Sequence, residues 1–127
     1  MITIIRVEHT NGWGLWRARL NNNDNNSIIE SLDCFQEILD RHSNMPSVKN
    51  DPGLGSRDDN EFCAWGSINE FDRWMDRSWI PELVENGFKI LLIEVSECRV
   101  GKYQVVFKKE NVLQTKDITS LFLIIER

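Results

Sequence analysis

Among the residues of this chain that could carry out chemistry, the most conspicuous set is a row of carboxylates. Glu30, Asp33, Glu37 and Asp40 recur at spacings of three, four and three, which places them on one face of a helix. Such a row is suited to docking a cationic partner or to imitating a line of phosphates. The same spacing is also typical of an ordinary solvated helix face. Both interpretations make these carboxylates candidate binding residues.

A second candidate is an arginine within an apolar run near the N-terminus. Arg6 lies between Ile5 and Val7, in a stretch typical of a strand. A guanidinium there either extends to solvent from a strand with one solvated face or meets an anion. Gly12 and Gly14 follow, and a backbone without side chains can approach a ligand closely. The segment is therefore a candidate binding turn.

The histidines do not form a recognisable metal site. His9 and His42 are the only two in the chain, and their spacing from Asp51 and Asp58 matches no pattern of metal ligands. We therefore expect no metal, and we take His9, His42 and Asp51 as candidate binding residues. His42 is expected at the C-terminal end of a helix, where an imidazolium is modestly favoured. The sequence also lacks the short motifs of phosphate-binding loops, dinucleotide-binding turns, serine hydrolases and zinc proteases.

The elements that must position these residues are clearest in the N-terminal half. Residues 2–8 predict a first strand, and Ser27-Ile-Ile-Glu30 is a capping box that begins a helix reaching Arg41. Loop residues are predicted over 42–60 because no hydrophobic period is sustained there. The apolar face of the predicted helix consists of Ile28, Leu32, Phe35 and Leu39.

The C-terminal half combines short helices with a run of strands. Residues 62–65 predict a short strand, after which Ser67-Ile-Asn-Glu70 forms a second capping box. Another short helix is expected from Pro81 to Gly87. Three further strands are predicted over 88–95, 100–107 and 121–126. This order predicts a single α+β domain over residues 1–127, with one mixed, largely antiparallel sheet and two or three helices.

Composition limits the classes of partner. The net charge is −5, which would repel a nucleic-acid backbone and favours a basic protein partner. No apolar run is long enough to span a membrane or to serve as a signal peptide, so we expect a cytoplasmic protein. The three cysteines are widely spaced, which argues against a disulfide framework. The oligomeric state is not predicted.

Several of these segments together resemble a family of small phage and prophage proteins. The resemblance covers most of the chain, although each motif is short, and the expected His-Pro pair is broken because Ser43 follows His42. It is carried in chain order by residues 6–17, 41–46, 51–53 and 63–67, then by Phe71 and Trp74, and finally by 101–107. The resemblance implies an accessory protein of a mobile element, acting in the host cell cytoplasm in conflict between phage and host.

A more distant similarity is to the ADP-ribosyltransferase fold. It rests on the order of an arginine on the first strand, a central serine and a polar residue on a late strand, here Arg6, Ser67 and Gln104. This similarity implies an NAD-using enzyme in which the arginine grips phosphates and the serine positions a ribose. Gln104 lacks the charge of the usual glutamate, and Ser67 is equally explained as a helix N-cap.

The sequence therefore leaves three hypotheses of function. The first is a cofactor-free inhibitor, similar in mode to an anti-CRISPR protein, that binds a basic host or defence protein through its acidic helix face. The second is an ADP-ribosyltransferase-like enzyme using NAD, or a binder of an ADP-ribose-type nucleotide. The third is an immunity protein against a toxin.

The working surface is predicted from the irregular segments. The turn over residues 11–16 and the loop over 42–60 are expected to adjoin at the end of the sheet that carries Arg6. Trp13, Trp16 and Arg17 are candidate binding residues on this surface, because exposed aromatic rings make good anchors. The alternative is that both indoles close the core from one side.

Overall fold

A computed structural model describes residues 2–10, 12, 14, 30–44, 50–56, 58 and 60–123. These residues form α-helices and antiparallel strands, which confirms the predicted α+β class. The helices are α2 (Phe35–His42), α3 (Ile68–Trp74) and α4 (Ile80–Glu85). The strands are β1 (Ile2–His9), β2 (Glu61–Ala64), β3 (Phe88–Val95), β4 (Arg99–Val100), β5 (Val105–Lys108) and β6 (Val112–Asp117). Short 3₁₀ turns are η2 (Arg77–Trp79), η3 (Lys109–Asn111) and η4 (Thr119–Phe122).

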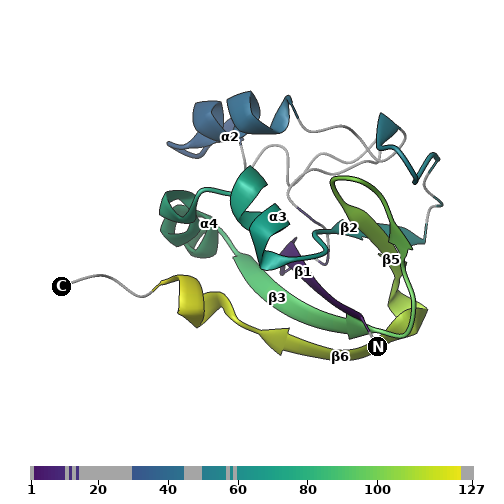
Figure 1. The fold of residues 1–127 in the computed structure, drawn as a ribbon. Helices are drawn as coiled ribbons and strands as arrows, with labels where there is room; N and C mark the ends of the chain where they lie inside the picture. The colour runs from purple at the N-terminus through teal and green to yellow at the C-terminus, as the bar shows by residue number, and fades with distance from the viewer. Residues whose placement is uncertain are drawn as a thin grey trace.

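The strands form two sheets rather than the single sheet that the sequence predicted. Both are antiparallel and three-stranded, with orders β1-β3-β6 and β2-β5-β4. Ile5 and Trp65 join them through one antiparallel bridge, in which each backbone N–H donates to the other carbonyl at 2.8 Å. In Figure 1 the helices lie on one side of the β1-β3-β6 sheet, and β2 and β5 lie beside it.

Strand β3 is largely apolar, apart from Lys89 and Glu94, because both of its faces are covered. Phe88 and Ile90 belong to the cluster that also contains the buried side chains of α3 and α4. Leu91, Ile93 and Val95 pack instead with apolar residues of β2 and β5. Successive side chains of a strand point to opposite faces, so the continuous run 88–95 is explained by a central strand between a helical layer and a second sheet.

The helix predicted from the first capping box differs from the structure. Residues 31–34 form turns and α2 begins only at Phe35, while Ser27 and Ile28 lie outside the described residues. This later start changes which side chains face the core. Ile38 is fully buried, whereas Leu39, which was predicted to be on the apolar face, is 39% exposed.

The second capping box is confirmed in part. The Ser67 hydroxyl accepts a hydrogen bond from the Glu70 backbone N–H at 3.2 Å, which is the N-cap interaction. The Glu70 side chain does not complete the box in the expected way, because its Oε2 is buried without a hydrogen-bond partner in the described part of the chain. Ser67 therefore begins α3 through its hydroxyl alone.

Two of the C-terminal strand predictions were wrong. Residues 100–107 are not one strand but the hairpin of β4 and β5, which pair with each other. Of the strand predicted over 121–126, the described residues 121 and 122 belong to η4.

The strand β6 was not predicted, because its residues are polar and mostly exposed, as suits an edge strand. Its end is fixed by Thr119, whose hydroxyl accepts from the Ile90 N–H at 2.8 Å.

No helix among the described residues is long and apolar enough to cross a lipid bilayer.

Candidate functional site

The four carboxylates of the predicted row are all exposed, but they do not lie on one uninterrupted helix. Asp33 lies in the turn that precedes α2, while Glu37 and Asp40 lie within α2. In the described part of the chain none of the four forms an ion pair with a cation. Asp40 accepts a hydrogen bond from the Gln36 side chain at 2.8 Å. We call Glu30, Asp33, Glu37 and Asp40 the acidic face.

A glutamate from another helix fixes the start of α2. Glu82 of α4 accepts hydrogen bonds from the backbone N–H of Asp33 at 2.6 Å and of Cys34 at 3.2 Å. Burial raises the pKa of Glu82, but these contacts outweigh it and the pKa is lowered overall. Burial, together with Glu82, raises the pKa of the Cys34 thiol to about 12. Glu82 therefore adds a fifth carboxylate beside the acidic face and leaves Cys34 un-ionised.

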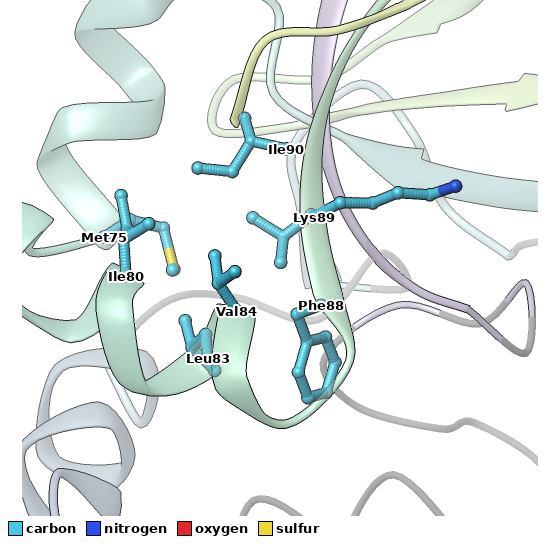
Figure 2. A pocket seen from close by; sticks show the side chains of 8 residues that line it. Met75, Ile80, Leu83, Val84, Phe88, Lys89 and Ile90 are labelled. Carbon is cyan, nitrogen blue, oxygen red and sulfur yellow. The ribbon is translucent and has the colours of Figure 1, made fainter. Parts of the chain in front are cut away.

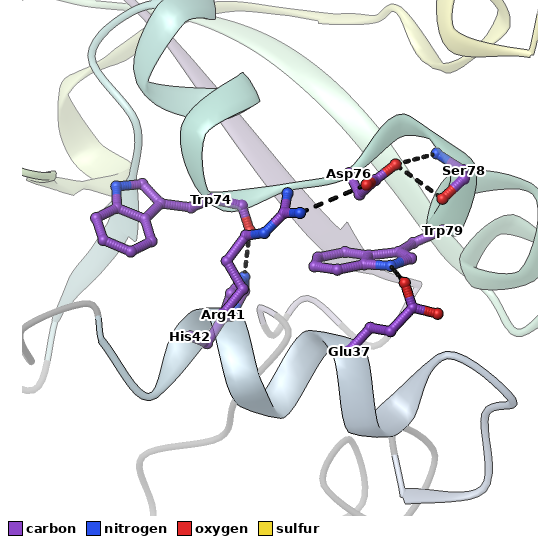
Figure 3. Close-up of polar contacts among 7 residues, drawn as sticks. All are labelled: Glu37, Arg41, His42, Trp74, Asp76, Ser78 and Trp79. Atoms are coloured by element: carbon purple, nitrogen blue, oxygen red, sulfur yellow. Dashed lines mark hydrogen bonds and ion pairs between the residues drawn. The ribbon is translucent and has the colours of Figure 1, made fainter.

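Arg41, the arginine of α2, contacts the segment that follows α3 (Figure 3). Arg41 pairs with Asp76 at 3.5 Å, and its guanidinium lies 4.9 Å from the centre of the Trp79 ring. The Trp79 indole N–H in turn points to Glu37 Oε1 at 3.5 Å. These contacts attach α2 to the segment after α3. Because Arg41 is engaged with Asp76, it does not neutralise the acidic face.

His42 is a packing residue at the end of α2. Its Nε2 lies 2.7 Å from the Trp74 carbonyl oxygen and therefore donates a hydrogen bond to it (Figure 3). The ring lies edge-on to Trp65 and Trp79, at 6.5 and 6.1 Å between centres. Burial lowers the pKa of His42, so the expectation of a favoured imidazolium at this helix end was wrong. Desolvation is the largest cause of this shift and exceeds the opposing effect of the hydrogen bond to the Trp74 carbonyl.

Arg6 is neither solvated nor open to a ligand anion in this structure. It is 4% exposed and lies on the face of β1 that meets the second sheet. Its Nε pairs with Glu8 at 2.9 Å and its Nη1 donates to the Cys63 carbonyl at 2.6 Å. The guanidinium also lies 5.3 and 5.9 Å from the ring centres of Phe62 and Phe107. Arg6 thus lies in the layer between the two sheets. Its burial could not be predicted from the sequence, because the side of β1 that carries Arg6 is covered only by the second sheet.

The predicted glycine turn lies close to Arg6. A Cβ added at Gly14 would be 3.5 Å from Nη1 of Arg6 and 3.7 Å from the Val7 carbonyl oxygen. Gly12 has φ +89°, a conformation that favours glycine. Trp13, Trp16 and Arg17 lie outside the described residues, so their predicted role as anchors stays a prediction.

His9 supports the connection between α4 and β3. Its Nε2 lies 3.0 Å from the Asn86 carbonyl oxygen, and its ring packs edge-on against Phe88 at 4.9 Å. Gly87 follows with φ +96°, and a Cβ there would lie 2.6 Å from His9 Nε2. The close approach requires a glycine at this turn. His9 and His42 therefore have structural contacts in separate regions, and no group of three metal-ligand side chains occurs in the described residues.

Asp51 organises the turn between β4 and β5. The residue is 2% exposed, and its carboxylate accepts backbone N–H groups of Lys102 at 2.6 Å, Tyr103 at 3.1 Å and Gln104 at 3.2 Å. A Cβ at Gly101 would lie 2.5 Å from Asp51 Oδ1. Three successive backbone amides that surround one carboxylate form an anion-binding nest. Asp51, which was a candidate binding residue, therefore binds the protein's own backbone.

A second carboxylate, that of Glu61, holds the loop that precedes β2. This role was not predicted from the sequence. Glu61 is buried and forms a two-pronged ion pair with Arg99, at 2.9 and 2.8 Å. The Arg99 hydrogen bonds lower the pKa of Glu61 to about 2. Arg99 also donates to the carbonyl oxygens of Leu54 and Ser56. The sequence around Glu61 and around Arg99 contains no local pattern that would predict an ion pair between positions so far apart in the chain.

The three residues suggested by the ADP-ribosyltransferase resemblance have different surroundings. Arg6 is engaged between the sheets, and Ser67 caps α3. Gln104 is 5% exposed, and its backbone N–H donates to Asp51. Their catalytic roles stay a prediction, and the contacts described here give each of them a structural role.

A narrow apolar crevice lies between α4 and β3 (Figure 2). It is too narrow to admit a water molecule. The Lys89 side chain extends its ammonium away from it (Figure 2). This view shows no polar side-chain group that is directed into the crevice and could orient a ligand. Its lining residues are Val7, Met75, Ile80, Leu83, Val84, Phe88, Lys89 and Ile90. The acidic face is therefore the better candidate surface.

Comparison with known proteins identifies one family. The family model described as bacteriophage T4 Y00F protein matches residues 1–120. No curated protein and no solved structure matches the chain.

Proposed function

Because the chain belongs to the bacteriophage T4 Y00F protein family, we propose that it is a phage accessory protein that binds a basic host or defence protein and blocks it. The family membership confirms the phage resemblance seen in the motifs. The proposed binding mode is stoichiometric and uses the acidic face.

The observation that carries this proposal is the unneutralised charge of the acidic face. Its four carboxylates are exposed, and none forms an ion pair in the described part of the chain. Arg41, the nearest arginine along α2, is paired with Asp76 instead. Clustered like charges repel one another and are relieved by a partner of opposite charge. Leu39 is 39% exposed between Glu37 and Asp40, and it supplies an apolar contact that charge alone lacks.

The rigidity of this surface also supports binding. The start of α2 is held by Glu82, and its end is held by Arg41 and His42. A surface that is already ordered loses less conformational entropy on association. The carboxylates are therefore presented on a fixed backbone.

Capture of a host protein tests the proposal. Wild-type protein immobilised on a resin should retain a basic protein from host lysate at about 0.1 M salt and release it near 1 M, where charges are screened over only about 3 Å. Neutralising three of the four carboxylates of the acidic face with D33N, E37Q and D40N should abolish retention. The matched control E94Q, E97Q and E110Q has the same change of net charge, on β3 and the segments that follow it.

Two outcomes would contradict this proposal. Equal retention by both triple variants, with unchanged melting temperatures, would show that the acidic face is not the contact surface. Equal loss in both would show that net charge alone governs retention. If the captured protein is a toxin encoded beside the gene, the immunity hypothesis is supported in place of host inhibition.

A further inference from the structure

One arginine differs from all the others in the described part of the chain. Arg6, Arg41, Arg77 and Arg99 each pair with a carboxylate, on Glu8, Asp76, Asp72 and Glu61. Arg73 has no such pair. Its guanidinium carbon instead lies 5.2 Å from the centre of the Trp74 ring and 5.3 Å from that of Tyr103. Arg73 is exposed, in a chain of net charge −5.

A second cation meets the same aromatic ring. The Lys102 ammonium lies 5.4 Å from the centre of the Tyr103 ring. Like Arg73 it is exposed, and no ion pair involves it in the described structure. The Trp74 and Tyr103 rings pack edge-on at 6.2 Å between centres. We call Arg73, Trp74, Lys102 and Tyr103 the cationic patch.

The backbone beneath the cationic patch is held firmly on both sides. Arg73 and Trp74 end α3, and the Trp74 carbonyl accepts the His42 hydrogen bond. Lys102 and Tyr103 lie in the turn whose amides bind Asp51. The Asp51 charge is satisfied by three backbone N–H groups and is buried. The two cations are therefore preorganised by their scaffold and their stacking, at little entropic cost to a ligand.

The cationic patch also contains a hydrogen-bond donor without an acceptor. The indole Nε1 of Trp74 is buried and has no partner in the described part of the chain. A buried donor left unpaired costs about 1–3 kcal/mol. It belongs to the ring that Arg73 covers. This N–H has no accessible surface, so a ligand on the cations would reach it only if the ring shifted.

We propose that the cationic patch binds the phosphate group of a small phosphorylated molecule. A phosphate monoester carries close to two negative charges, which matches one guanidinium and one ammonium. Arginine presents a fork of donors to phosphate oxygens, and lysine acts as a point charge. Stacking on the rings leaves the edge of the guanidinium available for this fork. The site is separate from the acidic face and does not depend on the proposed function.

Titration with three probes tests this proposal by following the indole and backbone N–H signals of the protein by NMR. Inorganic phosphate and adenosine 5′-monophosphate should cause saturable shifts at the Trp74 indole and at the Lys102 and Tyr103 amides, and adenosine should not. Tighter binding of the nucleotide than of phosphate would identify a nucleotide as the source. Equal binding would identify free phosphate.

Variants separate a specific site from general charge. R73Q and K102Q should each weaken phosphate binding by at least about tenfold, a change of about 1.4 kcal/mol. K116Q has the same charge change at an exposed lysine of β6 and should bind as the wild type does.

Three results would overturn the proposal. These are the absence of saturable shifts at the cationic patch, equal weakening by K116Q and R73Q, and binding of adenosine as tight as that of its phosphate.

Discussion

At the scale of single residues, His42 shows how burial alters an ionisable group. The side chain donates to the Trp74 carbonyl oxygen and is enclosed by aromatic rings, and its pKa is lowered from 6.5 by burial. The neutral ring is therefore favoured in the folded protein.

The lowered pKa of His42 predicts a loss of stability in mild acid. Above about pH 6.5 the ring is neutral in both states. As the pH falls below this value, the unfolded chain binds the proton more readily than the folded chain, so the free energy of unfolding decreases until the folded pKa is reached. Urea unfolding between about pH 7 and 5 should show this slope, and H42Q, which retains an N–H donor, should reduce it.

The other histidine provides the control for this measurement. H9Q leaves His42 unchanged, and the slope should persist in that variant. A slope unaffected by H42Q would show that His42 is not the titrating group. The carboxylates with lowered pKa values act in a lower window, because the Glu61 pKa falls from 4.5 to about 2.

At the scale of elements, the start of α2 is determined by another helix. Glu82 of α4 accepts hydrogen bonds from the backbone N–H groups of Asp33 and Cys34. It therefore replaces the N-cap side chain, which usually comes from the start of the same helix. Cys34, at the N-cap position, makes no side-chain cap itself. The acidic face therefore depends on α4 for its geometry.

Removing this contact should loosen α2. E82A is expected to lower the free energy of unfolding by about 1 kcal/mol, the usual cost of a lost cap, and to speed hydrogen exchange at the Asp33 and Cys34 amides. E85A removes an exposed carboxylate from the same helix and should change neither quantity appreciably. Equal effects of the two variants would show that Glu82 acts only through its charge.

At the scale of the whole molecule, Arg6 connects the two sheets. It lies on β1, donates to the Cys63 carbonyl on β2 and packs between Phe62 and Phe107. Glu8, which pairs with Arg6, also pairs with Lys109 at 3.3 Å. The backbone joins the sheets at the Ile5–Trp65 bridge, so side chains in this layer determine how the sheets pack.

Truncating Arg6 should therefore destabilise the entire fold. R6A is expected to lower the free energy of unfolding by about 3 kcal/mol, because it leaves the Glu8 carboxylate with one partner fewer in a largely buried layer. R77A breaks an exposed ion pair with Asp72 and should cost less than about 1 kcal/mol. Denaturant unfolding gives both values. A cost for R6A no greater than that for R77A would show that Arg6 does not hold the sheets together.

The sequence by itself determined features that depend on neighbouring residues. The α+β class, strand β3 and the Ser67 cap follow from local periodicity and capping chemistry, and the phage family was indicated by short motifs in their order. The exposure of the acidic face could also be predicted from the sequence, because charged side chains are rarely buried without a partner.

The tertiary structure decided whatever depends on contacts between distant residues. The division into two sheets buries Arg6, and the partners of Asp51 and Glu61 lie 51 to 53 and 38 positions away. Glu82 sets the start of α2 from 49 positions away. The cationic patch likewise forms only because the end of α3 meets the turn between β4 and β5. No local pattern encodes such pairings, since burial and hydrogen bonding are satisfied by whichever residues the folded chain brings together.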